Sequence, residues 1–179
     1  MKTDNSWDRY HDREDSPGRK RYDYAVSHLF GSVLDVGCGD GFGMYLMNKN
    51  IAVKSVTGID IQAEAVEKAK TNLHGLNLTI VKADAENIPF HNNSFDCVFC
   101  GQTLEHVKDD RKVINEIRRV IKRRVVFSVP INGGISQQHV REYKSEKEFI
   151  DLISQYFKTK STRIFNDGKY KRLVVVAEK

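Results

Sequence analysis

The sequence has few of the residues that mark secreted or membrane-spanning proteins. Its 179 residues include only three cysteines, three prolines and one tryptophan. Three cysteines are too few for a disulfide framework and indicate a reducing compartment, so we expect a cytoplasmic protein. No run of about 18 apolar residues is present, and the polar residues 1–21 hold no apolar stretch that would serve as a secretory signal. We therefore expect no membrane span.

Charge is unevenly distributed along the chain. The net charge is +5, but residues 25–107 carry five basic and nine acidic side chains, whereas residues 108–124 carry eight basic and three acidic ones. The first half of the chain after residue 24 is therefore acidic, which is compatible with a cationic ligand there.

Short apolar runs alternate with amphipathic stretches from about residue 33 onwards, which is the pattern of a parallel sheet covered by helices. The predicted strands are Ser32–Val36, Ser55–Asp60, Leu76–Lys82, Phe95–Cys100, Arg124–Val129, Lys158–Phe165 and Lys171–Glu178. The predicted helices are Gly41–Asn50, Gln62–His74, Lys108–Lys122 and Ser145–Phe157. The turn Asn166-Asp167-Gly168 predicts that the last two strands form a hairpin.

These elements predict an α/β fold. We expect a Rossmann-like, doubly wound, mostly parallel seven-stranded sheet with an antiparallel hairpin at its C-terminal edge and helices on both faces. Residues 1–24, which are polar and turn-prone, are expected to form an arm or lid, and residues 25–179 a single domain.

Four glycines in seven residues follow the first predicted strand, in Leu34-Asp35-Val36-Gly37-Cys38-Gly39-Asp40-Gly41-Phe42-Gly43. Glycine lets the backbone turn sharply and lets a ligand approach it closely. The dinucleotide fingerprint needs glycines at its first, third and sixth positions, but the sixth residue is Phe42 when counted from Gly37 and Met44 when counted from Gly39. A phosphate-binding loop would need Lys followed by Ser or Thr, which is missing. Nicotinamide and flavin dinucleotides, ATP and GTP are thus disfavoured as ligands.

An acid lies about 20 residues after this loop. Asp60 ends the second predicted strand, in Val56-Thr57-Gly58-Ile59-Asp60-Ile61. A carboxylate in that place can accept hydrogen bonds from both hydroxyls of a ribose. The alternative is that Asp60 caps the helix that begins at Gln62, and the two roles are compatible.

Two further motifs complete a resemblance. They are Val81-Lys82-Ala83-Asp84-Ala85-Glu86-Asn87-Ile88-Pro89-Phe90, and the strand Ser94–Cys100 followed by Gly101-Gln102-Thr103-Leu104-Glu105-His106-Val107. With the glycine loop and the Asp60 motif, they make residues 30–130 resemble class I S-adenosylmethionine-dependent methyltransferases. The resemblance is strongest to the small-molecule group that includes ubiquinone-biosynthesis-like enzymes (methyltransferase type 11).

This resemblance implies S-adenosylmethionine as the cofactor. Asp60 would bind its ribose, Ile61 would pack against its adenine, and Asp84 with the Ala85 amide would read the adenine edge. Asp35 would help to hold its amino group. The cofactor-binding residues expected by resemblance are Asp35, Gly37, Cys38, Gly39, Asp60, Ile61, Asp84, Ala85, Gly101 and Gln102.

Methyl transfer from a sulfonium is an in-line displacement that depends on alignment and on exclusion of water. An oxygen or nitrogen acceptor that carries a proton in addition needs a base to remove it. His106, just after the fourth predicted strand, and His139, between Ile131 and Tyr143, are the candidate catalytic residues. The alternatives are a structural role in the turn for His106 and a surface loop position for His139.

Two other features have simpler explanations. Cys97 and Cys100 are three residues apart on a strand, so their side chains should face opposite sides, and we expect two buried cysteines and no metal site. The basic run Arg118, Arg119, Lys122, Arg123 and Arg124 is expected to be a solvated helix end. Nucleic acid is therefore disfavoured as a partner but stays open.

The leading hypothesis is an enzyme that methylates a small-molecule acceptor on O, N or C, as a monomer or homodimer. The alternatives are a nucleic-acid or protein methyltransferase, or a non-catalytic subunit that holds S-adenosylmethionine. The Asn/Asp-Pro-Pro-aromatic motif typical of base-amine methylation is missing after strand four, where Gly101-Gln102-Thr103-Leu104 stands. Lys122-Arg123-Arg124 replaces the Pro-Gly-Gly turn usual in the family, and no substrate-cap domain is expected. Residues 1–24 and 131–144 would then recognise the acceptor.

Overall fold

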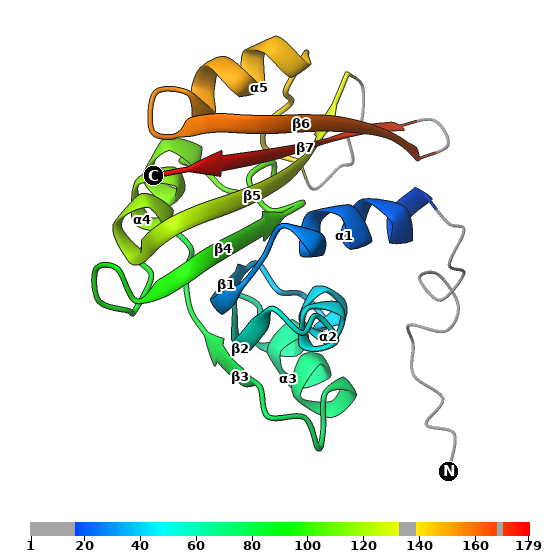
Figure 1. Ribbon diagram of the computed structural model, residues 1–179, viewed down its shortest axis with the longest axis vertical. Helices are drawn as coiled ribbons and strands as arrows, with labels where there is room; N and C mark the ends of the chain where they lie inside the picture. The colour runs from blue at the N-terminus through cyan, green and yellow to red at the C-terminus, as the bar shows by residue number, and fades with distance from the viewer. Residues whose placement is uncertain (1–16, 133–138, 168–169) are drawn as a thin grey trace.

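A seven-stranded sheet organises residues 17–132, 139–167 and 170–179, which are the residues that the computed structural model describes (Figure 1). The strands are β1 (Gly31–Val36), β2 (Val53–Asp60), β3 (Thr79–Lys82), β4 (Phe95–Gly101), β5 (Ile121–Ile131), β6 (Lys158–Asp167) and β7 (Tyr170–Glu178). The helices are α1 (Pro17–Ser27), α2 (Phe42–Asn48), α3 (Ala63–Asn72), α4 (Asp110–Val120) and α5 (Glu146–Ile153). The strand order is β3-β2-β1-β4-β5-β7-β6, which runs from the bottom of Figure 1 to the top.

The expected doubly wound sheet with a C-terminal hairpin is confirmed. Strands β3, β2, β1, β4 and β5 pair in parallel, and β7 is antiparallel to both of its neighbours. The antiparallel strand is thus the inner member of the hairpin, and β6 forms the edge. The physical reason is burial, because Leu173–Ala177 of β7 is fully or almost fully buried, whereas β6 begins with the polar run Lys158–Arg163, which suits an edge strand. Gly168 of the expected turn lies outside the described residues.

Apolar side chains cover the two faces of the sheet in two layers. Helices α1, α2 and α3 pack on one face, and α4 and α5 pack on the other. Cys97 belongs to the first layer and Cys100 to the second, and both are buried and free. The prediction that these two side chains face opposite sides of the sheet is therefore confirmed.

Helix α1 is a difference from the sequence-based expectation. Residues 17–24 of the expected arm form most of this helix, and residues 1–16 lie outside the described residues. Most residues of α1 are polar, so the sequence does not indicate that the helix packs on the sheet. Ala25 and Val26 of the helix and Leu29 just after it are nevertheless buried against the sheet. Packing against the rest of the domain thus stabilises this segment, as it does for most protein helices.

Several element boundaries also differ from the expected ones, and the starts of β3 and β5 are two of them. Strand β3 begins at Thr79 rather than at Leu76, because the Leu78 amide donates a hydrogen bond to the Leu76 carbonyl in a turn before the strand. Helix α4 ends at Val120, and β5 begins directly at Ile121, three residues earlier than predicted. Ile121 is completely buried and pairs with Phe95 of β4, so this residue is taken into the sheet.

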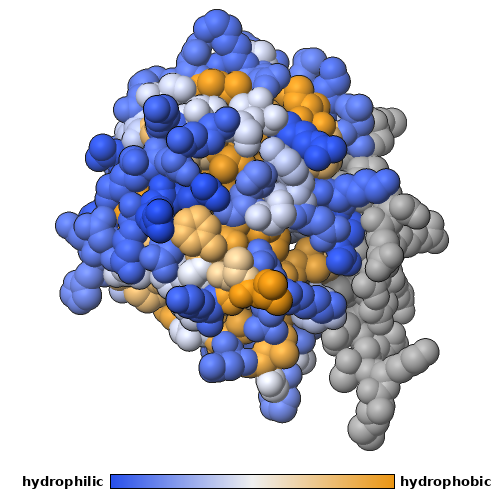
Figure 2. Space-filling view, in the orientation of Figure 1, coloured by the Kyte–Doolittle hydropathy of each residue, from blue (hydrophilic) through white to orange (hydrophobic). Residues whose placement is uncertain are grey.

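Hydrophilic residues cover most of the face seen in Figure 2, and hydrophobic residues gather in the lower middle of that view. None of the helices in the described ranges is both long enough and apolar enough to cross a membrane.

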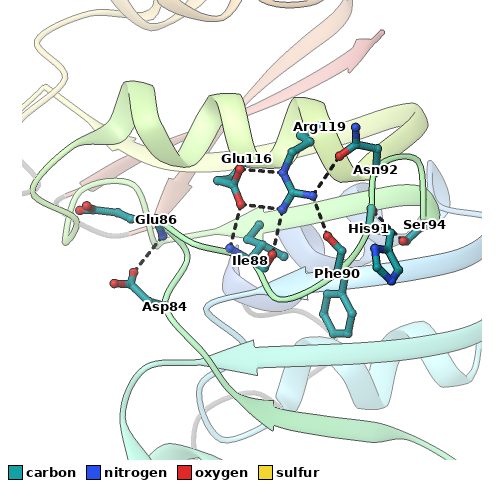
Figure 3. Close-up of polar contacts among 9 residues, drawn as sticks. All are labelled: Asp84, Glu86, Ile88, Phe90, His91, Asn92, Ser94, Glu116 and Arg119. Carbon is teal, nitrogen blue, oxygen red and sulfur yellow. Dashed lines mark hydrogen bonds and ion pairs between the residues drawn. The ribbon is translucent and has the colours of Figure 1, made fainter.

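Arg119 and Glu116 of α4 bond the loop between β3 and β4 (Figure 3). The Arg119 guanidinium donates to the carbonyls of Phe90 at 2.6 Å and Ile88 at 2.8 Å, and its Nη2 lies 2.7 Å from Glu116 Oε2. The same Glu116 carboxylate accepts a hydrogen bond from the Ile88 amide at 2.9 Å. A guanidinium presents its donors in a planar fork, which a lysine cannot replace. Arg119 and Glu116 therefore fix the loop between β3 and β4, which contains Asp84.

We expect Arg119→Ala to lower the free energy of unfolding by about 1.5–3 kcal/mol, because it removes charged hydrogen bonds to two loop carbonyls. Denaturation in urea measures this loss. Arg118→Ala is the matched control, since the neighbouring Arg118 makes one hydrogen bond, to the Tyr156 carbonyl, and should cost clearly less. Equal losses in the two variants would show that Arg119 does not hold the loop.

Candidate functional site

A cavity of about 830 Å³ opens at the carboxyl ends of the parallel strands. It lies where the strand order reverses, with β2 and β3 on one side of β1 and β4 on the other. Open α/β sheets bind their ligands at this point. The residues that line it are Gly37, Gly39, Ile59, Asp60, Ile61, Gln62, Ala83, Asp84, Ala85, Glu86, Gln102, Thr103, His106, Val107 and Lys108.

The glycine loop forms one wall of the cavity. Gly37 and Gly39 have positive φ angles of 73° and 55°, a left-handed conformation that favours glycine. A Cβ at Gly37 would overlap the Thr103 side chain, whereas a Cβ at Gly39 would meet no atom within 4 Å. Gly37 is thus required for packing, and Gly39 leaves open space on the cavity side. Cys38 between them is 7% exposed and does not line the cavity, and burial raises the pKa of its thiol.

Asp60 links this loop to the end of β2. Its Oδ2 accepts a hydrogen bond of 3.0 Å from the Gly39 amide, and its Oδ1 accepts one of 2.9 Å from the Gln62 amide. The N-cap of α3 is Gln62, so Asp60 stands just outside the helix rather than at its cap position. Ile61, beside it on the cavity, has 59% of its surface exposed. The structure therefore brings the predicted acid, the glycine loop and an exposed apolar side chain together.

Asp84 and Ala85 line the cavity on the loop after β3. The Asp84 Oδ1 accepts a hydrogen bond of 2.8 Å from the Glu86 amide, as Figure 3 shows, which shapes the turn. The Ala83 amide donates to the Asp60 carbonyl at 2.9 Å and joins this loop to β2. Asp60 and Asp84 thus face the same cavity from the ends of neighbouring strands.

The loop after β4 closes the opposite side. The φ angle of Gln102 is 55°, unusual for a residue other than glycine, and its amide donates to the Ser128 carbonyl at 2.7 Å. Such a conformation is often found at functional sites. Gly101 does not line the cavity, and packing alone accounts for this glycine, because a Cβ there would overlap the Phe99 ring.

Asp35 lies on β1 outside the cavity lining and is only 2% exposed. Its Oδ2 would lie 3.0 Å from a Cβ at Gly43, so the helix α2 glycine gives it room. Burial, and to a smaller extent the negative charge of Asp60, together raise the pKa of Asp35 to about 8. In the absence of a positive partner this carboxyl therefore tends to keep its proton at neutral pH.

The two predicted histidines lie side by side. The ring centroids of His106 and His139 are 4.8 Å apart, and His106 lines the cavity. Glu105, which precedes His106 in the chain, is only 1% exposed. Its main-chain carbonyl accepts hydrogen bonds from the Val140 and Arg141 amides at 2.9 and 3.2 Å. Burial raises the pKa of the Glu105 carboxyl to about 7. Gly133 and Gly134 of the segment before His139 lie outside the described residues.

Sequence reasoning missed some residues of this site. Gln62, Glu86, Thr103 and Lys108 line the cavity without having been predicted, and Glu105 carries a buried carboxylate at its edge. Each of them lies within a few residues of a predicted position, so their place in the same loops is the sequence feature that could have identified them. Which of those side chains turn toward the cavity depends on loop conformation and is not encoded in the motif.

Asp35→Asn should make stability less dependent on pH. A folded pKa near 8 means that, between about pH 4 and pH 8, the folded protein holds a proton that the unfolded chain has released. The stability contribution of Asp35 therefore falls as pH rises through this window, by at most about 1.4 kcal/mol per pH unit. We expect the free energy of unfolding of the variant, relative to the parent, to rise between pH 5 and pH 8 and then to level off.

Urea denaturation at pH 5, 6.5 and 8 measures this difference. Asp151→Asn, which changes an exposed carboxylate on α5, is the control and should give a constant difference. A constant difference for Asp35→Asn as well would mean that Asp35 is ionised in the folded protein.

Comparison with known proteins identifies a family to which this chain is related. A family model described as a methyltransferase domain matches residues 34–129. The chain is 35% identical over 92 residues to a ubiquinone/menaquinone biosynthesis C-methyltransferase of Desulfotalea psychrophila, covering 51% of this chain and 37% of that protein. It is 40% identical over 111 residues to a ubiquinone biosynthesis O-methyltransferase of Vibrio vulnificus, covering 57% of this chain and 46% of that protein. The matches thus span less than half the length of these curated relatives.

The fold has solved counterparts. A geranyl diphosphate methyltransferase solved in complex with S-adenosylmethionine superposes with a TM-score of 0.74 at 14% identity, covering 89% of this chain and 84% of that one. This likeness confirms the Rossmann-like fold. The family match covers more than half of the chain. It includes the glycine loop, Asp60, Asp84 and the loops after β3 and β4 that line the cavity. The chain belongs to the methyltransferase domain family.

Proposed function

We propose that the protein binds S-adenosylmethionine in the cavity and transfers its methyl group to a small-molecule acceptor. The observation that carries this proposal is the hydrogen bond between the Gly39 amide and Asp60 Oδ2, which unites the glycine loop and the strand-end acid on one wall. This pair stands at the reversal point of the sheet, where a nucleoside is bound in doubly wound folds. The family relationship supports the same ligand.

The residues present fit this cofactor. A cavity of about 830 Å³ is in the range of small-molecule sites. The space beside Gly39 has no protein atom within 4 Å of a Cβ position, so a ligand can approach the backbone there. A carboxylate has about four lone-pair sites, and Asp60 uses two of them for Gly39 and Gln62. The remaining capacity suits the two hydroxyls of a ribose.

Bound S-adenosylmethionine would supply an activated methyl group on a positively charged sulfur. We infer that Asp60 holds the ribose while Asp84 and the Ala85 amide orient the adenine. Asp35 and Gln102 would act at the methionine end of the cofactor. Because Asp35 is buried, a positively charged group beside it, such as the amino group of the cofactor, would stabilise its ionised form. Alignment of the methyl group with the acceptor would supply much of the acceleration. His106 and His139 would act on the acceptor, because His106 lies on the cavity and His139 contacts its ring.

A small-molecule acceptor is favoured over nucleic acid. The relatives named above act in quinone biosynthesis according to their names. The basic run that could have contacted nucleic acid is largely used inside the protein, since Arg119 holds the β3–β4 loop, Arg118 bonds the Tyr156 carbonyl and Arg124 pairs with Glu178 at 2.8 Å. The expected solvated helix end is therefore corrected in part, because Lys122, Arg123 and Arg124 lie on β5 rather than on the helix. The contacts of Arg118, Arg119 and Arg124 with other parts of the domain leave less of this charge available to nucleic acid. The three buried free cysteines agree with a reducing compartment, and we propose a cytoplasmic location.

Calorimetry tests the ligand directly. S-adenosylmethionine and its demethylated product S-adenosylhomocysteine should both release heat on binding, whereas NAD should not, because the glycine register does not fit a dinucleotide. Binding of NAD with no response to either sulfur nucleoside would overturn the proposal.

Substitution of the two acids tests their roles. Asp60→Ala should weaken S-adenosylhomocysteine binding by about 1.5–3 kcal/mol, the value of hydrogen bonds to a charged group. Asp84→Ala should cost less, because one hydrogen bond is lost rather than two. Glu67→Ala, on the exposed surface of α3, is the control and should bind like the parent. Equal or reversed losses for Asp60 and Asp84, with unchanged circular dichroism, would show that the two acids are misassigned.

A further inference from the structure

Three side chains with metal-binding atoms converge at the edge of the cavity. One ligand atom each from Glu105, His106 and His139 lies within 4.8 Å of the other two. Glu105 and His106 come from the loop after β4, and His139 comes from the segment that follows β5. Two segments more than 30 residues apart in sequence are thus brought together at this point.

Glu105 is the least expected member of this cluster. Its side chain is 1% exposed, and its Oε2 is buried without a hydrogen-bond partner among the described residues. A buried carboxylate oxygen without a partner costs free energy and needs an explanation. The positive charges of Arg172 and Arg21 act on this carboxyl and lower its pKa, but they leave Oε2 without a hydrogen bond. A bound cation would give that oxygen a partner, because a carboxylate is a good metal ligand.

The surrounding contacts hold the two segments together independently of the histidine rings. The Glu105 carbonyl accepts hydrogen bonds from the Val140 and Arg141 amides. Arg141 Nε lies 3.0 Å from Asp110 Oδ2, and the same carboxylate oxygen accepts a 3.0 Å hydrogen bond from the Tyr143 hydroxyl. His139 is therefore anchored next to His106 by main-chain bonds and by a buried acid on α4.

We propose that Glu105, His106 and His139 form a site for a divalent transition-metal ion, such as Zn²⁺ or Co²⁺, at the wall of the cavity. Two imidazoles and one carboxylate suit such ions better than Mg²⁺ or Ca²⁺, which prefer oxygen ligands alone. Metal bonds of roughly 2.0–2.2 Å would place the donor atoms about 3.3 Å apart. The present separations, which do not exceed 4.8 Å, would close by small rotations of the His106 and His139 side chains.

Three protein ligands leave at least one coordination position free, which is typical of catalytic rather than structural sites. The following role rests on the proposed function. An acceptor hydroxyl bound at the free position would lose its proton to solvent more easily. Its oxygen would then bond to the methyl carbon, and the carbon–sulfur bond would break with its electron pair remaining on sulfur. The two histidines would thus act through the cation rather than as free bases.

Metal titration of the untagged, chelator-treated full chain tests the site without relying on activity. Zn²⁺ should bind with one equivalent per chain by calorimetry, and Co²⁺ should produce visible absorption bands of a nitrogen- and oxygen-ligated ion. His106→Ala, His139→Ala and Glu105→Gln should each weaken Zn²⁺ binding at least about tenfold, since even the loss of a group that supports a ligand costs that much. The matched control is His91→Ala, which removes another exposed histidine outside the cluster and should bind like the parent.

Two results would overturn the metal site. One is a parent protein that binds Zn²⁺ no more tightly than the His106→Ala/His139→Ala double variant, and the other is an equal loss in His91→Ala. Thermal unfolding of each variant shows whether it is folded, and the double variant keeps the test informative if Glu105→Gln is not. Binding of S-adenosylhomocysteine by the chelator-treated parent reports on the proposed function separately, so the two proposals can fail independently.

Discussion

One carbonyl oxygen, that of Ile59 near the end of β2, accepts hydrogen bonds from two successive amides of the glycine loop. Gly37 donates at 2.8 Å and Cys38 at 2.9 Å. The chain can present both amides to one acceptor because Gly37 and Gly39 adopt left-handed conformations. Once the loop is bound in this way, the Gly39 amide reaches Asp60 Oδ2, and the wall of the cavity is complete. The arrangement of the site thus depends on main-chain contacts that most side-chain substitutions cannot remove.

The same device recurs along the sheet edge. The Val36 carbonyl at the end of β1 accepts a hydrogen bond of 3.0 Å from Thr103 Oγ1, and the Ser128 carbonyl of β5 accepts one from the Gln102 amide. The Asp60 carbonyl in turn receives the Ala83 amide. Carbonyls of three parallel strands, β1, β2 and β5, therefore position the loops that follow the neighbouring strands. Two acidic groups of this edge, Asp35 and Glu105, are kept from water, and burial raises the pKa of each.

Most of the sheet could be predicted because its strands are apolar runs between clear turn signals. The glycine loop and Asp60 were also predictable, since motif spacing fixes which strand ends carry them. Helix α1 was not, because few of its residues are apolar and its burial depends on packing against α2 and the sheet. The pairing of His106 with His139 could not be derived either. Both residues were candidates from sequence, but their contact depends on the Glu105 carbonyl capturing Val140 and Arg141, which no local pattern encodes.

The place of β7 between β5 and β6 has a consequence for how the protein is made. Strand β5 ends at Ile131, and its partner β7 begins only at Tyr170. At about 5–20 residues per second, the ribosome needs roughly 2–8 s to make the intervening segment. During that time the buried residues Val125–Val129 would present an unpaired hydrophobic edge to other nascent chains. The time for which this edge stays unpaired during synthesis is thus set by the distance in sequence between β5 and β7, and not by the stability of the finished sheet.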